Sequence, residues 1–315
     1  MALLEVEHLK KYFNTPMGLL HAVDDVSFTL DAGKTMGVVG ESGCGKSTLG
    51  KTLIHLQECT DGKIIFEGKD ITHVNRRQLR EVRNNMRIIF QDPYASLDPR
   101  LTVEETLKEV FTVSGHLSKS QVNEQAEAIM ELVGIDQRLR TSYPHELDGG
   151  RRQRVGIGRA LAMNPKFIVC DEPVSALDVS IQAQILNLLM DLQEQLGLSY
   201  LFVTHDLSVV RHISHSICVL YLGQLVETAP TDTIFESPLH PYTKALISAI
   251  PSIDIDKPMQ NVALEGELVS PINPDPGCRF APRCPYATEA CLQPQQLSEA
   301  EPGHFVSCSR VKEIN

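Results

Sequence analysis

Residues 40–48 read Gly-Glu-Ser-Gly-Cys-Gly-Lys-Ser-Thr, which matches the phosphate-binding pattern G-x-x-x-x-G-K-[ST]. An apolar run at 36–39 predicts a buried strand before it, and 49–54 open a predicted helix after it. In that setting the glycines let successive backbone N–H groups point at phosphate oxygens, and the helix N-terminus adds partial positive charge. The alternative, a glycine-rich turn with a chance lysine, is disfavoured by these flanks.

The whole loop is therefore a predicted phosphate site. Lys46 is expected to reach the terminal phosphates, and the Ser47 hydroxyl is expected to bind Mg²⁺. The other candidate binding residues are Gly40, Glu41, Ser42, Gly43, Cys44, Gly45 and Thr48.

Net charge and hydropathy argue against a nucleic-acid-binding protein and against a membrane-spanning one. The 315 residues carry a formal net charge of −11, which argues against a nucleic-acid partner because such proteins usually present a basic face. No stretch approaches the roughly 18 apolar residues that span a bilayer. The N-terminus lacks a basic region followed by an apolar run, so we see no signal peptide. We expect a cytosolic chain, soluble or held at a membrane by a partner.

Two carboxylates follow a second apolar run. Residues 167–170 are apolar, and Asp171 and Glu172 come directly after them, before Pro173. This pattern favours a central parallel strand whose tip carries a Mg²⁺-binding aspartate and a general-base glutamate. A pair of surface acids is the alternative, which the buried strand before them disfavours.

Further elements can be placed by periodicity. Strands are predicted at 3–9, 26–30, 64–66, 88–90, 199–204 and in a hairpin around Gly223, and helices at 103–112, 119–133, 151–162 and 179–195. Residues 11–18 are expected to form a loop whose Tyr12 or Phe13 could face a nucleotide base. Gln91 and His205 each follow a predicted strand, at the end where open α/β sheets bind ligands.

In order along residues 3–240, these motifs resemble the ATP-binding subunit of an ABC transporter. The phosphate loop, the Gln91 loop, a signature at Leu147–Arg151, the 167–172 strand, a D-loop at 175–178 and the His205 switch all occur. The resemblance implies an α/β fold with a mixed-sheet core, an antiparallel β subdomain and a helical subdomain at about 95–158. It also implies a domain division at 1–240 and 241–315.

The resemblance assigns roles to individual residues. Glu172 would polarise the attacking water, Asp171 and Ser47 would hold Mg²⁺ with Gln91 sensing metal and water, and His205 would contact the γ-phosphate. Phe13 is favoured for stacking on adenine, with Tyr12 the alternative and Val23 a further nucleotide contact. Residues acting at the opposing subunit, or in the D-loop, are Asp148, Gly149, Gly150, Arg151, Ser175 and Asp178.

One position departs from the family pattern. Asp148 replaces the usual signature serine, and a carboxylate facing a triphosphate is unfavourable unless a nearby cation such as Arg151 compensates. In the family, two ATPase subunits stack head to tail and share their two ATP sites. We therefore expect the site completed by Asp148 to be weak or slow, and we favour a heterodimer with a second, homologous ATPase over a homodimer.

The C-terminal region narrows the resemblance. The segments 240–246, 277–285 and 303–308 are similar to the tails of dipeptide and oligopeptide importer ATPases, and nickel importers share much of the pattern. The expected function is the ATPase of a peptide importer, at the cytoplasmic face of the cell membrane. The alternatives are a metal-chelate importer and, in another class, a regulatory ABC ATPase without transport. The expected partners are two permease subunits and, indirectly, an extracytoplasmic binding protein.

Four cysteines cluster in this tail. Their spacing is Cys-x5-Cys-x6-Cys-x16-Cys, at Cys278, Cys284, Cys291 and Cys308, which is not a common structural zinc pattern. Four thiolates suit an iron–sulfur cluster, and the resemblance favours [4Fe–4S] over Zn²⁺ or no metal. The tail is rich in proline and lacks an obvious core of its own, so a metal would be its staple.

Overall fold

The computed structural model describes residues 1–114, 117–250 and 270–315. The chain divides into two compact units, Val74–Leu201 and the remainder, Met1–His73 with Phe202–Asn315. The division predicted from the sequence, at 1–240 and 241–315, remains a prediction.

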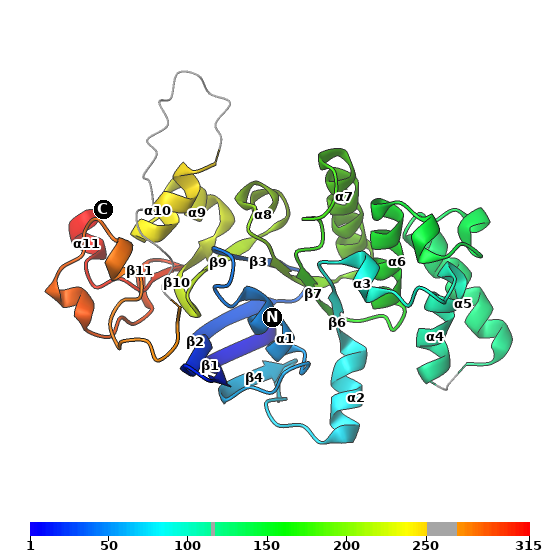
Figure 1. Ribbon diagram of the computed structural model, residues 1–315, viewed down its shortest axis with the longest axis horizontal. Coiled ribbons are helices and arrows are strands. Elements are labelled where there is room, and N and C mark those ends of the chain that lie inside the picture. Colours follow the sequence, from blue (N-terminus) through cyan, green and yellow to red (C-terminus); the bar gives the residue numbers. More distant parts are fainter. Residues whose placement is uncertain (115–116, 251–269) are drawn as a thin grey trace. The chain divides into compact units, whose positions relative to one another are not determined.

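The first unit begins with an antiparallel sheet of four strands in the order β2-β1-β4-β5 (Figure 1). They are β1 (Ala2–Thr15), β2 (Gly18–Asp31), β4 (Asp61–Phe66) and β5 (Lys69–Asp70). Leu4, Val6 and Ile64 pack on its buried face. The predicted antiparallel sheet is thus confirmed.

The loop expected at 11–18 is wrong. β1 continues to Thr15 and β2 begins at Gly18, so that only two residues turn the chain. Tyr12 and Phe13 are strand residues paired with His21 and Leu20. Antiparallel pairing across a tight turn extends both strands here, although Pro16 and Gly18 indicated a longer loop.

The same unit contains a mixed sheet. The strand β3 (Thr35–Val39) pairs in parallel with β9 (Ser216–Tyr221), and β9 pairs antiparallel with β10 (Gln224–Pro230). The sheet continues through β12 (His304–Val306) to β11 (Ser298–Glu301). Its helices are α1 (Lys46–Leu53), α8 (Leu207–Ile213), α9 (Thr231–Glu236), α10 (Pro241–Ser248) and α11 (Val311–Ile314).

The described part of the C-terminal tail shares the core of this unit. Phe280 is 1% exposed and packs with Tyr221 and Tyr242, at ring-centre distances of 5.2 and 5.4 Å. A strand of the tail, β12, extends the mixed sheet by pairing with β10. The tail therefore gains its apolar packing from the rest of the unit, which the sequence alone did not predict.

The second unit combines two parallel strands with helices. Its strands β6 (Met86–Ile89) and β7 (Phe167–Asp171) pair in parallel, with Met86 beside Phe167. The helices α4 (Val103–Ser114), α5 (Lys119–Leu132) and α6 (Gly149–Leu161) contact one another, as expected of a helical subdomain. The others are α3 (Pro93–Ser96) and α7 (Val179–Leu196). The strand β8 (Ser199–Val203), predicted at 199–204, contains the point where the chain passes from this unit to the first one, and all of its residues are buried.

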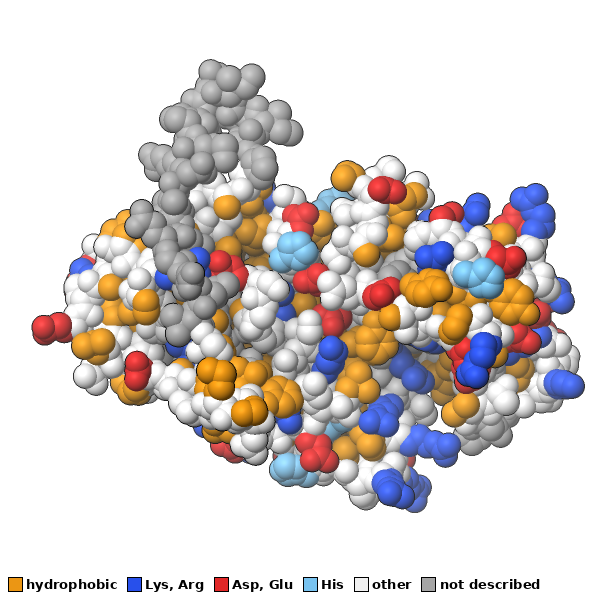
Figure 2. Space-filling view, in the orientation of Figure 1, with side chains coloured by type: hydrophobic (Ala, Val, Ile, Leu, Met, Phe, Trp, Pro, Cys, Tyr) orange, Lys and Arg blue, Asp and Glu red, His pale blue; other side chains and the backbone are white. Residues whose placement is uncertain are grey.

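Helix α2 (Arg76–Asn85) was not predicted. Asn75 caps it by accepting from the Arg77 and Gln78 amides, and the Gln78 side chain completes a capping box. Val82 is its one buried residue, and basic side chains gather on its surface in Figure 2. Leu79, Val82 and Met86 follow helical spacing among charged residues, so this pattern and the cap were local signals that the prediction from sequence missed.

Among residues 1–114, 117–250 and 270–315, no helix has the length and hydropathy that crossing a bilayer requires.

Candidate nucleotide-binding and hydrolysis site

The predicted phosphate loop lies between the fully buried strand β3 and helix α1. Gly45, immediately before α1, has φ of 104°, and a Cβ there would lie 2.0 Å from the carbonyl oxygen of Ala22. Only glycine fits this position. Lys46 is 5% exposed, and its Nζ donates to the carbonyl oxygens of Gly40 and Glu41 at 2.7 and 2.9 Å. The strand–loop–helix prediction is confirmed.

Contacts from the C-terminal half hold this loop, and they could not be predicted from the sequence. The backbone N–H of Glu41 donates to the Tyr242 hydroxyl at 2.9 Å. The Glu41 carboxylate accepts two hydrogen bonds from Arg283, and the N–H of Gly223 donates to the Cys44 carbonyl oxygen at 2.8 Å. These residues lie far away in the sequence, so no local pattern connects them to the loop.

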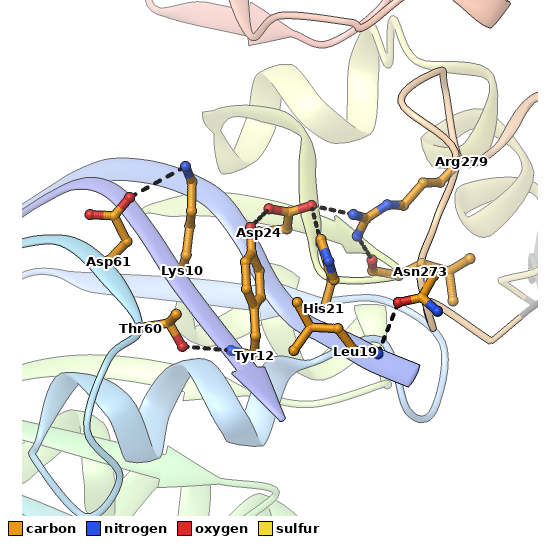
Figure 3. Close-up of polar contacts among 10 residues, drawn as sticks. Lys10, Tyr12, Leu19, His21, Asp24, Thr60, Asp61, Asn273 and Arg279 are labelled. Carbon is orange, nitrogen blue, oxygen red and sulfur yellow. Dashed lines mark hydrogen bonds and ion pairs between the residues drawn. The ribbon is translucent and has the colours of Figure 1, made fainter. Parts of the chain in front are cut away.

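The residues expected near the base lie on the β1–β2 hairpin. Tyr12 stacks on His21 with ring centres 4.0 Å apart, and its hydroxyl donates to Asp24 (Figure 3). Burial and the Asp24 hydrogen bond raise the pKa of Tyr12, so it stays a neutral donor. The Lys11 ammonium lies 4.8 Å from the centre of the Phe13 ring.

Val23, also expected near the base, is fully buried. Phe13 remains the predicted base-stacking residue, with Tyr12 the alternative.

In the second unit, the two carboxylates end the buried strand as expected. Asp171 is the last residue of β7 and is 4% exposed. Glu172 follows with φ of 47°, a left-handed conformation that is uncommon for a residue with a side chain. Its Oε2 accepts a hydrogen bond from the Gln91 amide at 2.8 Å. The structure thus brings together two residues that the sequence placed 81 positions apart, and the backbone conformation fits a residue held for function.

Ser175 of the predicted D-loop contacts the backbone of Glu172. The Ser175 N–H and hydroxyl both approach the Glu172 carbonyl oxygen, at 3.3 and 3.2 Å. Asp178 sits at the N-cap position of α7. His205, in the first unit, is exposed in the turn after β8, and Asp206 beside it caps α8.

The signature segment begins helix α6. Asp148 is the N-cap, and its carboxylate accepts from the Arg151 N–H at 2.8 Å and lies 3.4 Å from the Arg151 guanidinium. Gly150 is buried, and a Cβ there would lie 2.7 Å from the Ile181 side chain of α7. The cation expected to compensate Asp148 is therefore present in the same turn.

The four tail cysteines line one small cavity, together with residues of α10 and α11. Cys291 is buried and the other three are partly buried. Burial raises the pKa of the Cys278 thiol to about 11. Among the residues that the structure describes, no group of three His, Cys, Asp or Glu side chains is placed to hold a single metal ion.

A larger cavity, of about 960 Å³, lies elsewhere in the first unit. It is lined by β1, β2, β9, β10 and residues near β12, and it includes no residue of the phosphate loop. We therefore do not take it for the nucleotide site.

The matching family models agree with this geometry. Residues 23–175 match the ABC transporter family, and residues 226–291 match the family described as "Oligopeptide/dipeptide transporter, C-terminal region".

Close relatives match along almost the whole chain. The oligopeptide transport ATP-binding protein AppF of Bacillus subtilis is 48% identical, covering 97% of this chain and 96% of its own length. The oligopeptide transport ATP-binding protein OppF of Salmonella typhimurium is 49% identical, covering 98% and 93%.

Solved structures share the fold. The cbiO1 subunit of Clostridium perfringens, part of the ABC transporter complex cbiONQ, matches with a TM-score of 0.67 and 27% identity over 75% of this chain and 91% of its own. A dimeric ATP-binding cassette in a post-hydrolysis state, bound to ADP and phosphate, matches with a TM-score of 0.65 and 27% identity over 72% and 98%. The chain belongs to the ABC transporter family, as an ATP-hydrolysing subunit that carries the C-terminal region of the oligopeptide/dipeptide transporters.

Proposed function

We propose that this ATPase powers the import of dipeptides or oligopeptides through a membrane ABC transporter. The observation that carries the proposal is the match to oligopeptide transport ATP-binding proteins at 48–49% identity over nearly the full length, C-terminal region included. A regulatory ABC ATPase without transport would not account for that C-terminal region.

Each of the predicted site residues has a separate role in ATP hydrolysis. Glu172 accepts a proton from the attacking water, and Gln91 orients its carboxylate through the 2.8 Å hydrogen bond. Lys46 binds the terminal phosphates, and His205 contacts the γ-phosphate. The hydroxyl of Ser47 and the carboxylate of Asp171, with the Gln91 amide, are the oxygen donors that Mg²⁺ prefers, and the metal would neutralise phosphate charge.

The expected partners follow from the family mechanism. Two membrane permease subunits would receive the motion of a head-to-tail ATPase pair, at the cytoplasmic face of the membrane. Asp148 supports a heterodimer, because a homologous partner can supply a serine to the site that this chain's own phosphate loop begins. An extracytoplasmic binding protein would select the cargo.

A metal in the tail belongs to the same proposal. Four thiols converge on one cavity from three segments, around Cys278 and Cys284, at Cys291 and at Cys308, so the donor set fits a [4Fe–4S] cluster. The thiols would bind it as thiolates and join the three segments covalently through the cluster. Zn²⁺ is the alternative occupant.

The proposal is tested by uptake. The subunit is expressed with its permease and binding protein in cells that lack peptide importers, and labelled di-, tri- and pentapeptides are supplied. We expect ATP-dependent accumulation that Lys46→Ala abolishes. Uptake of a nickel chelate alone would assign the metal-chelate alternative, and ATPase activity without copurifying permease would support a regulatory ATPase.

A further inference from the structure

A short segment of the tail carries two buried arginines. Arg279 and Arg283 lie between Cys278 and Cys284, and the side chain of each is 6% exposed. Burying an arginine is costly unless it is paired, so their partners indicate what the segment does. Both partners belong to segments of the same unit that are predicted to bind the nucleotide, namely the β1–β2 hairpin and the phosphate loop.

Arg283 holds the phosphate loop. Its two terminal nitrogens donate to the two carboxylate oxygens of Glu41, at 2.7 and 3.1 Å, in a bidentate ion pair. The Glu41 backbone N–H donates to the buried Tyr242 hydroxyl. The second residue of the loop is thus fixed at both its side chain and its backbone by residues C-terminal to position 240.

Arg279 holds the base-side hairpin. Its guanidinium donates to Asp24, which also accepts from the Tyr12 hydroxyl and lies 3.1 Å from His21 Nδ1 (Figure 3). It donates as well to the carbonyl oxygen of Leu222, in the β9–β10 turn.

The tail also pairs directly with β2. The His21 N–H donates to the Pro271 carbonyl oxygen and the Asn273 N–H to that of Leu19, each at 2.9 Å. The Asn273 side chain accepts from the Leu19 N–H at the same distance.

One aromatic anchor fixes both arginines. Phe280, next to Arg279 and three residues before Arg283, packs edge-on against Tyr221 and tilted against Tyr242. Since Tyr242 itself contacts the phosphate loop, the segment 279–283 and the loop are connected through a rigid, buried cluster.

Electrostatics indicates why the contact matters. Glu41 puts a carboxylate into a loop that binds triphosphate, and an uncompensated negative charge there would oppose the ligand. Asp24, which accepts from Tyr12 on the β1–β2 hairpin, is likewise paired with a guanidinium, that of Arg279. We propose that Arg279 and Arg283 are positioning residues for nucleotide binding: Arg283 neutralises and holds the phosphate loop, and Arg279 holds the hairpin that faces the base. The proposal rests on ATP binding, which the family establishes, and not on the identity of the cargo.

The test measures nucleotide affinity of the full-length chain, with ATP hydrolysis recorded alongside. Arg283→Gln is expected to raise the Kd for MgATP about tenfold, equivalent to about 1.4 kcal/mol, with kcat within about twofold. Arg283→Lys should restore part of the affinity. The matched control is Arg310→Gln, in the same tail, where the arginine pairs with Glu313, donates to the carbonyl oxygen of Tyr286, lines the cavity of the four cysteines and contacts no nucleotide motif.

Comparing two ligands, ATP and inorganic triphosphate, distinguishes the role of Arg279 from that of Arg283. Arg279→Gln is expected to weaken ATP binding and leave inorganic triphosphate unchanged, whereas Arg283→Gln weakens both. Equal effects of the two variants on both ligands, or a Kd for Arg283→Gln that matches Arg310→Gln, would overturn the assignment.

A charge-removal variant keeps the proposal testable if Arg283→Gln folds poorly. In the double variant Glu41→Gln/Arg283→Gln the carboxylate and its guanidinium partner are both removed, so MgATP affinity should recover towards that of the wild type. A double variant that folds but binds MgATP about tenfold more weakly than the wild type contradicts the electrostatic role. Thermal unfolding of every variant separates these effects from loss of fold.

Discussion

Asp148 has a local structural role, because it is the N-cap residue of α6. Aspartate and serine are about equally good N-caps, and Asp148 accepts the Arg151 N–H as a serine hydroxyl would. The helix therefore does not distinguish the two residues. What differs is charge, and the nearby Arg151 guanidinium is half-exposed and only partly offsets it.

Asp148→Ser is accordingly expected to speed ATP hydrolysis by the assembled transporter several-fold, because it removes a carboxylate from the site across the dimer and keeps the cap. Steady-state phosphate release at saturating ATP measures it. Asp136→Ser is the matched control, since Asp136 caps a short 3-10 helix in the same unit, outside the motifs. An unchanged rate for Asp148→Ser would refute the unequal-site hypothesis.

Glu172→Gln should nearly abolish hydrolysis while ATP still binds. An amide keeps the shape and the contact with Gln91 but cannot accept a proton, and a general base contributes on the order of 10²–10⁴ in rate. Single-turnover kinetics and nucleotide-binding measurements separate the two effects. A loss of ATP affinity comparable to the loss of rate would instead make Glu172 a binding residue.

At the scale of elements, the strands that are buried along their whole length were predicted correctly from the sequence. The strands β3, β7 and β8 are entirely buried, and each contains a mostly apolar run that is visible in the sequence. Prediction failed at α2, which buries only Val82, and at residues 11–15, where pairing with β2 and not local propensity decides the conformation.

The tail offers an element-scale test of its packing. Phe280→Ala removes a fully buried ring, a change that typically costs about 3–5 kcal/mol. We expect a lower thermal midpoint and faster proteolysis of the tail. Phe305→Ala, in β12 and 36% exposed, is the control and should change either quantity little. Equal effects of the two variants would mean that Phe280 is not the anchor.

At the scale of the whole molecule, the motifs were predictable and their supports were not. Each motif is contiguous in sequence, and its chemistry dictates its residues. The Arg283–Glu41 pair joins positions 242 residues apart, and nothing near either residue identifies the other. The Gln91–Glu172 contact could be inferred only from the order of the family motifs along the chain.

The metal content of the purified protein tests whether the four tail cysteines hold an iron–sulfur cluster. After anaerobic purification, we expect about four irons and four sulfides per chain, as four cysteine ligands of a [4Fe–4S] cluster require, and loss of both in Cys284→Ser. Cys59→Ser, outside the tail, is the control and should keep them. Stoichiometric zinc would identify the other occupant, and neither metal would leave a tail held by its apolar packing, its strand pairing and its two arginine pairs.

The two arginine pairs limit how freely this tail can be exchanged between related ATPases. A chain that ends near residue 240 keeps every motif but leaves Glu41 and Asp24 without their guanidinium partners. A chimera inherits the same defect unless its tail matches the acids at positions 24 and 41. The tail and the nucleotide site are therefore expected to vary together between subunits, as a compatible set.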